Sequence, residues 1–142
     1  MVEPDPTPEA SPFSMPLRVR YIECDMQGRV YNAHYLTWVD MAHTEAIDQL
    51  FGGYREMVAA GVDLVVAAAD LQFRAPAHFD DRLQVHTTIR APGRTSLRSD
   101  FTITREETVL AEARMVHVCV DATSYEKQPW PDWLRAKLPG GA

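Results

Sequence analysis

Apolar residues recur at three- and four-residue spacing from Ala33 to Leu50, and a Gly52-Gly53 pair follows directly. This spacing predicts an amphipathic helix that buries one stripe and stops at the glycines. The stripe consists of Tyr35, Trp38, Val39, Ala42, Ala46 and Leu50. A second, shorter helical stretch is expected from Tyr54 to Ala60, where Gly61 ends it.

Alternation of apolar and polar residues predicts strands on both sides of this long helix. One strand is expected before it, from Leu17 to Glu23. Four are expected after it: Val62 to Phe73, Leu83 to Arg90, Thr95 to Arg105 and Thr108 to Asp121. The links between these four are too short for crossover helices, so the strands should be antiparallel. The sequence therefore predicts an α+β domain in which one long helix lies on an antiparallel sheet of about five strands.

Both ends of the chain differ from this patterned region. The first residues are acidic and rich in proline, which predicts a disordered leader. A last helical turn is expected between Pro131 and Leu138, with Trp133 and Leu138 packing inward. The expected divisions are 1–16 as leader, 17–138 as one domain and 139–142 as a tail.

Composition and charge narrow the range of functions. The chain has 142 residues, a net charge of -6, 46% hydrophobic and 24% charged residues, which is typical of a soluble protein and unfavourable for broad nucleic-acid or anionic-membrane binding. No apolar run reaches the length of a membrane span. Cys24 and Cys119 are too few for a disulfide framework, so a cytoplasmic location is expected. Neither the cysteines nor the five histidines show metal-ligand spacing, and we expect no metal or cofactor.

The candidate chemistry lies between the first predicted strand and the long helix. There the stretch from Asp25 to Leu36 places an acidic side chain just before the helix begins, where a carboxylate can attack a carbonyl. The free N–H groups of the first helical turn are suited to stabilising the negative oxygen that forms.

An ordered set of residues in this stretch matches a known family. The set is Asp25, Gly28, Val30, Asn32, Ala33, Tyr35 and Leu36, with Asp40 at a further acidic position. On these residues the chain resembles the hotdog-fold acyl-CoA thioesterases of the 4-hydroxybenzoyl-CoA thioesterase type. Segments 69–76, 80–85 and 127–129 extend the resemblance over roughly residues 17 to 138. One departure is Ala42-His43, where many relatives have Ala-Arg.

The resemblance implies a hotdog fold and hydrolysis of an acyl or aroyl thioester to the acid and the free thiol. Asp25 would act as nucleophile or as general base, and the Asn32 backbone N–H would bind the oxyanion. A metal is not needed to assist the leaving group, because the parent thiol has a pKa of about 8.5 and its thiolate leaves readily. Asn32 could equally be the N-cap of the helix, and the two roles are compatible.

Several further residues are candidates for the site. Gly28 is expected to permit a backbone conformation or a close ligand approach that a Cβ would block. Tyr35 is a candidate contact for the acyl group, although a core role is the alternative. Asp40 is expected to support the reacting groups rather than to react. An acidic protein needs local basic residues to bind coenzyme A, and the candidates are Arg90, Arg94 and Arg98, with solvated strand arginines as the alternative.

Other functions remain open at this level. The chain could instead hydrolyse thioesters on an acyl carrier protein, or bind acyl thioesters without turning them over. A hotdog hydratase is disfavoured, because the Asp-x-Asn-Pro-x-His type of segment is absent. The resemblance also implies a homo-oligomer, either a dimer or a tetramer built as a dimer of dimers. In such an assembly the sheets join edge to edge, and Asp25 faces residues of the other chain.

Overall fold

The computed structural model describes residues 10–140. In chain order the elements are β1 (Ala10–Arg18), the 3-10 helix η1 (Tyr21–Glu23), α1 (Asn32–Phe51), α2 (Tyr54–Ala59), β2 (Val62–Phe73), β3 (Arg82–Arg90), β4 (Ser96–Arg105), β5 (Thr108–Asp121) and α3 (Asp132–Arg135).

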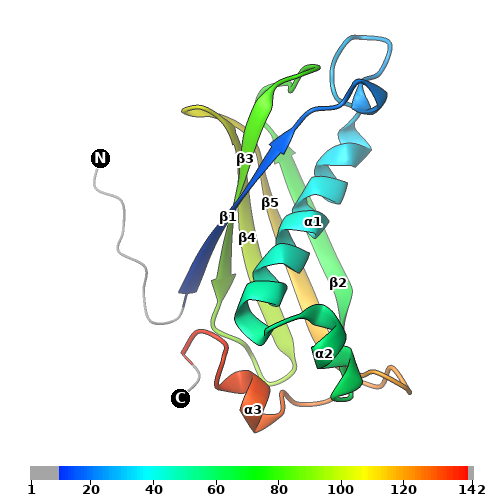
Figure 1. Ribbon diagram of the computed structural model, residues 1–142, viewed down its shortest axis with the longest axis vertical. Coiled ribbons are helices and arrows are strands. Elements are labelled where there is room, and N and C mark those ends of the chain that lie inside the picture. The colour runs from blue at the N-terminus through cyan, green and yellow to red at the C-terminus, as the bar shows by residue number, and fades with distance from the viewer. Residues whose placement is uncertain (1–9, 141–142) are drawn as a thin grey trace.

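The five strands form one antiparallel sheet in the order β1-β3-β4-β5-β2, and α1 lies along one of its faces (Figure 1). At the upper end of the sheet Arg18 of β1 pairs with Arg82 of β3, and α1 begins there. At the lower end Val62 of β2 pairs with Asp121 of β5, beside α2 and α3. The predicted fold, a long helix on a five-stranded antiparallel sheet, is confirmed.

Alternate residues of the strands point toward α1 and form two apolar clusters. The upper cluster includes Trp38, Val85, Phe101 and Met115, and the lower cluster includes Ile47, Ile89, Leu97, Cys119 and Leu134. Each fully buried side chain of this size contributes about 1.5–3 kcal/mol. These clusters fix α1, and therefore its first turn, against the sheet.

The first strand starts earlier than predicted. β1 begins at Ala10, so residues 10–16, predicted to belong to a disordered leader, pair with β3 instead. Pro12 and Pro16 are tolerated in this strand because β1 is at the edge of the sheet. Residues 1–9 of the predicted leader lie outside the described residues.

The predicted strand from Leu17 to Glu23 is wrong beyond Arg18. Residues 21–23 form η1, in which the backbone N–H of Arg20 donates to the Glu23 carboxylate at 2.7 Å. Tyr21 continued the alternating pattern, but its side chain is 79% exposed. The local hydrogen bond outweighs the strand propensity of this short segment.

The predicted C-terminal turn is present as α3, but its packing differs in part. Leu138 is buried as expected, whereas Trp133 is exposed. Trp130 and Leu134 fill the lower cluster instead. The bounds of β2 and β5 coincide with the predicted strands, and α1 differs by one residue at each end.

Candidate active site

Asp25 lies in a tight loop between η1 and α1. The loop closes on itself, because Asp25 N–H donates to Arg29 O at 2.8 Å and Gly28 N–H donates to Asp25 O at 3.0 Å. Gly28 has a φ of 75°, which L side chains rarely adopt, and a Cβ there would meet nothing within 4 Å. Of the two reasons predicted for this glycine, backbone conformation is therefore the one that the fold requires.

Hydrogen bonds hold the loop to the segment before β3 and to η1. Val30 N–H donates to Ala77 O at 2.9 Å, and Arg29 forms a bridge with His78, which joins the loop to the segment before β3. Tyr31 N–H donates to Glu23 O at 2.9 Å, which closes the base of the loop at the start of α1. The backbone around Asp25 is thus fixed by tertiary hydrogen bonds.

The Asp25 carboxylate is exposed, and only one of its two oxygens accepts a hydrogen bond within the described residues. Its Oδ1 accepts the Gln27 N–H at 2.8 Å, and within the described residues its Oδ2 has no hydrogen-bond partner. A shallow pocket of about 480 Å³ surrounds it, lined by Tyr21, Ile22, Cys24, Met26 and Phe79. Most of these side chains are apolar and exposed, so the free carboxylate oxygen lies beside an apolar surface.

Glu23, two residues before Asp25, is a buried carboxylate that the sequence did not reveal. It is 3% exposed, and Trp38 Nε1–H donates to its Oε2 at 2.8 Å. Burial would raise the pKa of Glu23, but hydrogen bonds from the Arg20 backbone, from Trp38 and from the Arg20 side chain hold that pKa below its usual value. Glu23 therefore ties η1 to α1 as an anion, and we regard it as a positioning residue for the Asp25 loop. The only sequence signal was its place two residues ahead of Asp25.

The first turn of α1 supplies free backbone donors. Tyr31 occupies the N-cap position without a side-chain capping bond, and Asn32 is the first helical residue, so the predicted N-cap role of Asn32 is wrong. Within the described residues the Asn32 N–H donates to no backbone or side-chain acceptor. The helix dipole adds a partial positive charge at this point, so the turn is suited to binding an anionic oxygen.

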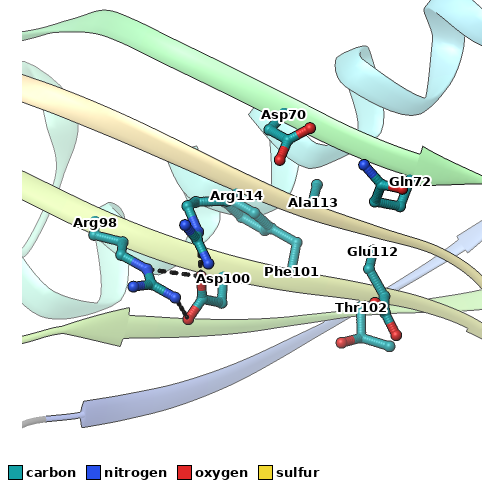
Figure 2. A pocket seen from close by; sticks show the side chains of 9 residues that line it. All are labelled: Asp70, Gln72, Arg98, Asp100, Phe101, Thr102, Glu112, Ala113 and Arg114. Atoms are coloured by element: carbon teal, nitrogen blue, oxygen red, sulfur yellow. Dashed lines mark hydrogen bonds and ion pairs between the residues drawn. The ribbon is translucent and has the colours of Figure 1, made fainter.

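The predicted coenzyme A arginines lie elsewhere in the protomer. Arg90 and the turn that holds Arg94 are at the lower end of the sheet, about 26 Å along β3 from the upper end. Arg98 and Arg90 hydrogen-bond Asp100 on the face of the sheet away from α1. Arg114 approaches the same carboxylate at 3.7 Å, and Figure 2 shows Arg98 and Arg114 beside Asp100.

This arginine cluster borders a shallow pocket of about 250 Å³. Burial would raise the pKa of Asp100, but hydrogen bonds from Arg98 and Arg90 keep that pKa below its usual value. Within one protomer the structure therefore does not bring Arg90, Arg94 or Arg98 to Asp25.

The two remaining candidates on α1 have different surroundings. Tyr35 is buried, its hydroxyl oxygen accepts the Ala77 N–H at 3.0 Å, and its ring packs on Trp38 and Phe73, which is the core alternative. Burial raises the pKa of Tyr35. Asp40 is exposed and lies two turns below the start of the helix, so within one protomer it is separated from Asp25.

Residues 10–140 contain neither a metal-binding cluster nor a membrane-spanning helix. No group of three or more His, Cys, Asp or Glu side chains in this range is placed to hold a metal ion. None of the helices formed by these residues is both long and apolar enough to cross a membrane.

Comparison with known proteins places this arrangement in a family. Residues 19–138 match the model of the thioesterase-like superfamily. The chain belongs to the thioesterase-like superfamily. The acyl-CoA thioester hydrolase YbgC of Escherichia coli is 32% identical over 127 residues, which cover 89% of this chain and 95% of that protein.

Other members of the superfamily agree in sequence and in fold. The 1,4-dihydroxy-2-naphthoyl-CoA hydrolase of Synechococcus elongatus is 27% identical, covering 82% of this chain and 90% of that protein. The crystal structure of a 1,4-dihydroxy-2-naphthoyl-CoA thioesterase from Synechocystis superposes with a TM-score of 0.80 at 25% identity, covering 90% and 96% of the two chains. The resemblance to hotdog thioesterases and the predicted enzyme class, thioester hydrolase, are confirmed.

Proposed function

We propose that this thioesterase hydrolyses acyl-CoA thioesters and that Asp25 carries the reaction. The observation that supports this most directly is the exposed Asp25 carboxylate, held in a braced loop that leads into the free N–H groups at the start of α1. The family match supplies the reaction class, and several relatives are named as acyl-CoA hydrolases. The apolar side chains around Asp25 provide a surface for the pantetheine or the acyl group.

Two routes use the same groups. In the first, an Asp25 carboxylate oxygen attacks the thioester carbon, the C–S bond breaks to release the thiolate, and water then hydrolyses the mixed anhydride. In the second, the carboxylate takes a proton from water, the resulting hydroxide attacks the same carbon, and the C–S bond then breaks to release the thiolate. In both, the carbonyl oxygen becomes negative and the Asn32 N–H stabilises it, which is a contribution of typically about 3–4 kcal/mol for one well-placed donor.

We also propose that the enzyme works as a dimer joined through β2. This edge strand is twelve residues long, and its Val66 and Phe73 side chains are each 51% exposed. A second β2 added antiparallel would cover these groups and continue the sheet. Such pairing would set the Asp25 end of one protomer beside the Val62 end of the other, and so complete the site from two chains.

The test is substitution of Asp25 by Asn, assayed by thiol release on a panel of aroyl-, short-chain and long-chain acyl-CoA substrates. Asn keeps the size and can accept the Gln27 N–H, but it is neither nucleophile nor base. We expect turnover to fall at least about a hundredfold while acyl-CoA binding and the unfolding midpoint stay nearly unchanged.

Asp40→Asn is the matched control, because Asp40 is an exposed carboxylate of α1 away from the loop. The loss of turnover in Asp40→Asn should be smaller than the loss in Asp25→Asn. Retention of more than about a tenth of wild-type turnover by Asp25→Asn, which is a barrier change of only about 1.4 kcal/mol, would reject the mechanism. Tight binding with no thiol release from any substrate would instead favour a non-catalytic module.

A further inference from the structure

A layer of buried polar side chains separates the two apolar clusters. On β3, β4 and β5 the inward residue between the clusters is Thr87, Ser99 and His117, respectively, and on α1 it is His43. All four side chains are at least nine-tenths buried. An apolar residue at each position would have joined the clusters into one, so the layer needs a physical explanation.

The two histidines face each other across this layer. The ring centroids of His43 and His117 are 3.8 Å apart and the rings are 7° from parallel. Burial lowers the pKa of His43 to about 3, with repulsion from His117 as a second cause, and burial lowers the pKa of His117 to about 4. Both imidazoles are therefore neutral at pH 7, and each offers one N–H donor and one nitrogen acceptor.

This hydrogen-bonding capacity is not used within the described residues. His43 Nε2, His117 Nδ1 and Ser99 Oγ are buried without a partner there. A buried polar atom left unpaired costs about 1–3 kcal/mol, and most buried polar atoms in native proteins have a hydrogen-bond partner, so three such atoms in one layer call for an explanation.

Both rings line a groove between α1 and β2. Asp40 and Thr44 of α1, Tyr54 of α2 and Val66 of β2 complete its walls. The groove has a volume of about 190 Å³, and an apolar cavity of about 150 Å³ is known to hold benzene, so a six-carbon acyl group fits.

The other polar walls restrict what can bind. The Tyr54 hydroxyl already donates to Asp63 Oδ1 at 2.7 Å, which raises the pKa of Tyr54 to about 12 and leaves the phenol protonated and occupied. The Asp40 carboxylate in the wall disfavours an anionic group by repulsion. The groove therefore suits a neutral group that exchanges hydrogen bonds with imidazole.

In the proposed dimer the groove would face the partner's Asp25 rather than the Asp25 of its own chain. His43 follows Asn32 by about 17 Å along α1, which is too far for the end of a short acyl group attached at the same protomer's Asp25. Antiparallel pairing of two β2 edges brings the Asp25 end of one protomer toward the lower half of the other β2, where Leu64 and Val66 border the groove.

We propose that this groove receives the far end of the acyl group and that the His43–His117 pair selects neutral acyl groups carrying a hydroxyl or carbonyl there. The inference rests on the proposed hydrolysis of acyl-CoA in a β2-linked dimer. A half-turn of either imidazole about χ2 exchanges nitrogen and carbon positions within nearly the same ring outline. A ligand hydroxyl can thereby gain the bond that the buried nitrogens lack. The two histidines are specificity-determining residues that do not take part in bond breaking.

The test compares matched substrates on His43→Phe and His117→Phe. Phenylalanine keeps a flat ring for stacking and removes the nitrogens. The substrate pairs are 4-hydroxybenzoyl-CoA with benzoyl-CoA, and 6-hydroxyhexanoyl-CoA with hexanoyl-CoA. We expect kcat/KM for the hydroxylated member of the preferred pair to fall at least about tenfold, while its unsubstituted partner changes less than about threefold.

Glu45→Gln, an exposed neighbour of Thr44 on α1 that does not line the groove, is the background control. Equal effects on both members of each pair, or no change in either ratio, would overturn the inference. Circular dichroism and the unfolding midpoint report whether the variants fold. If the phenylalanine variants fail to fold, Thr44→Phe narrows the groove from the exposed side of the helix. It should lower kcat/KM at least about tenfold for the six-carbon and aromatic substrates but not for acetyl-CoA, and equal effects on all of them would count against the groove.

The outcome also separates this inference from the proposed function. Wild-type enzyme that hydrolyses none of these thioesters contradicts the proposed function itself. Wild-type enzyme that hydrolyses them, with histidine variants that keep the wild-type ratios, leaves the proposed function intact and removes only the role of the histidine pair.

Discussion

The two edge strands of the sheet differ in composition and in what they leave exposed. β1 is nine residues long and carries Pro12 and Pro16. β2 is twelve residues long, contains no proline, and exposes Val66 and Phe73 together with three consecutive alanines, residues 67–69. Proline cannot donate to a neighbouring strand, so β1 is a poor template for further pairing, whereas β2 is a good one.

The edges also contribute differently to the candidate site. β1 leads directly into η1 and the Asp25 loop, and Glu23 fastens that connection to α1. β2 lines the groove that contains His43 and His117. The β1 edge therefore leads into the rigid loop that carries Asp25, while the β2 edge is left open for the second chain and the acyl group that we propose.

Among changes that test the difference between the two edges, a charge placed on β2 should have the largest effect. Ala68→Lys puts an ammonium group on exposed β2, where two-fold pairing would bring two such charges near each other. We expect the molar mass from light scattering to halve and thioester turnover to fall at least about tenfold, because each site would lose the residues of the other chain. Ser14→Lys places the same charge on β1 and should change neither the molar mass nor the thioester turnover. A wild-type protein that is monomeric and fully active would contradict the proposal that β2 joins two chains to complete the site.

Acid should weaken the β2 side of the molecule before the β1 side. The pKa values of His43 and His117 are lowered to about 3 and about 4, so below pH 6.5 the unfolded chain binds protons that the folded chain does not. Stability is then fully present above about pH 6.5 and falls as the pH drops, by roughly 4 kcal/mol for the pair at pH 5.

Urea unfolding between pH 7 and pH 5 measures this loss, and hydrogen exchange locates it. His117→Phe should show about half of the wild-type pH dependence. Amide protection should fall first in β2 and β5, because His117 pairs with Val66. Equal loss of protection in β1 and β2 would contradict a local origin at the histidine pair.

A smaller effect is expected from loosening the rigid side. Glu23→Gln removes the charge that accepts hydrogen bonds from Trp38 and Arg20, and we expect a loss of stability of about 1–3 kcal/mol. Because the Asp25 loop is fixed through this residue, kcat should fall while KM for acyl-CoA changes little.

Trp38→Phe removes the partner donor and is the comparison variant, although it also shrinks a buried ring of the upper cluster and so carries an added packing cost in stability. It should lower kcat in the same direction. If Glu23→Gln destabilises the fold but leaves kcat unchanged, Glu23 is structural only and has no positioning role.

Much of the fold follows from local pattern. The period of α1, the alternation in β2 to β5 and the short turns between them predict their bounds within one residue. β1 is the exception because proline and acidic composition resemble disorder in isolation, and only the pairing of Pro12 and Pro16 with β3 across the sheet makes the segment a strand. Likewise, the alternation through Tyr21 predicts a strand, and the bond from Arg20 to Glu23 produces a turn.

The candidate site was predicted only where its parts are close in sequence. Asp25, Gly28 and the start of α1 lie within one short stretch, and the structure places them together. The His43–His117 pair could not be predicted, since its members are on α1 and β5 and each looks ordinary in its own element. Arg90, Arg94 and Arg98 were chosen by their charge alone. Charge does not indicate which end of the sheet a residue occupies, so their position could not be predicted.

The pairing of β1 with β3 has a consequence for how the chain folds. Ser14 meets Gln84 across a sequence separation of 70 residues, whereas β3, β4 and β5 follow one another through tight turns. Closing a long loop costs more entropy than closing a hairpin, so β1 is expected to join a meander that has already formed. During synthesis β1 leaves the ribosome first and waits for its partner strand. The loop that carries Asp25 is therefore expected to acquire its final shape late, so a chain caught midway through folding would have most of its sheet but an incomplete Asp25 loop.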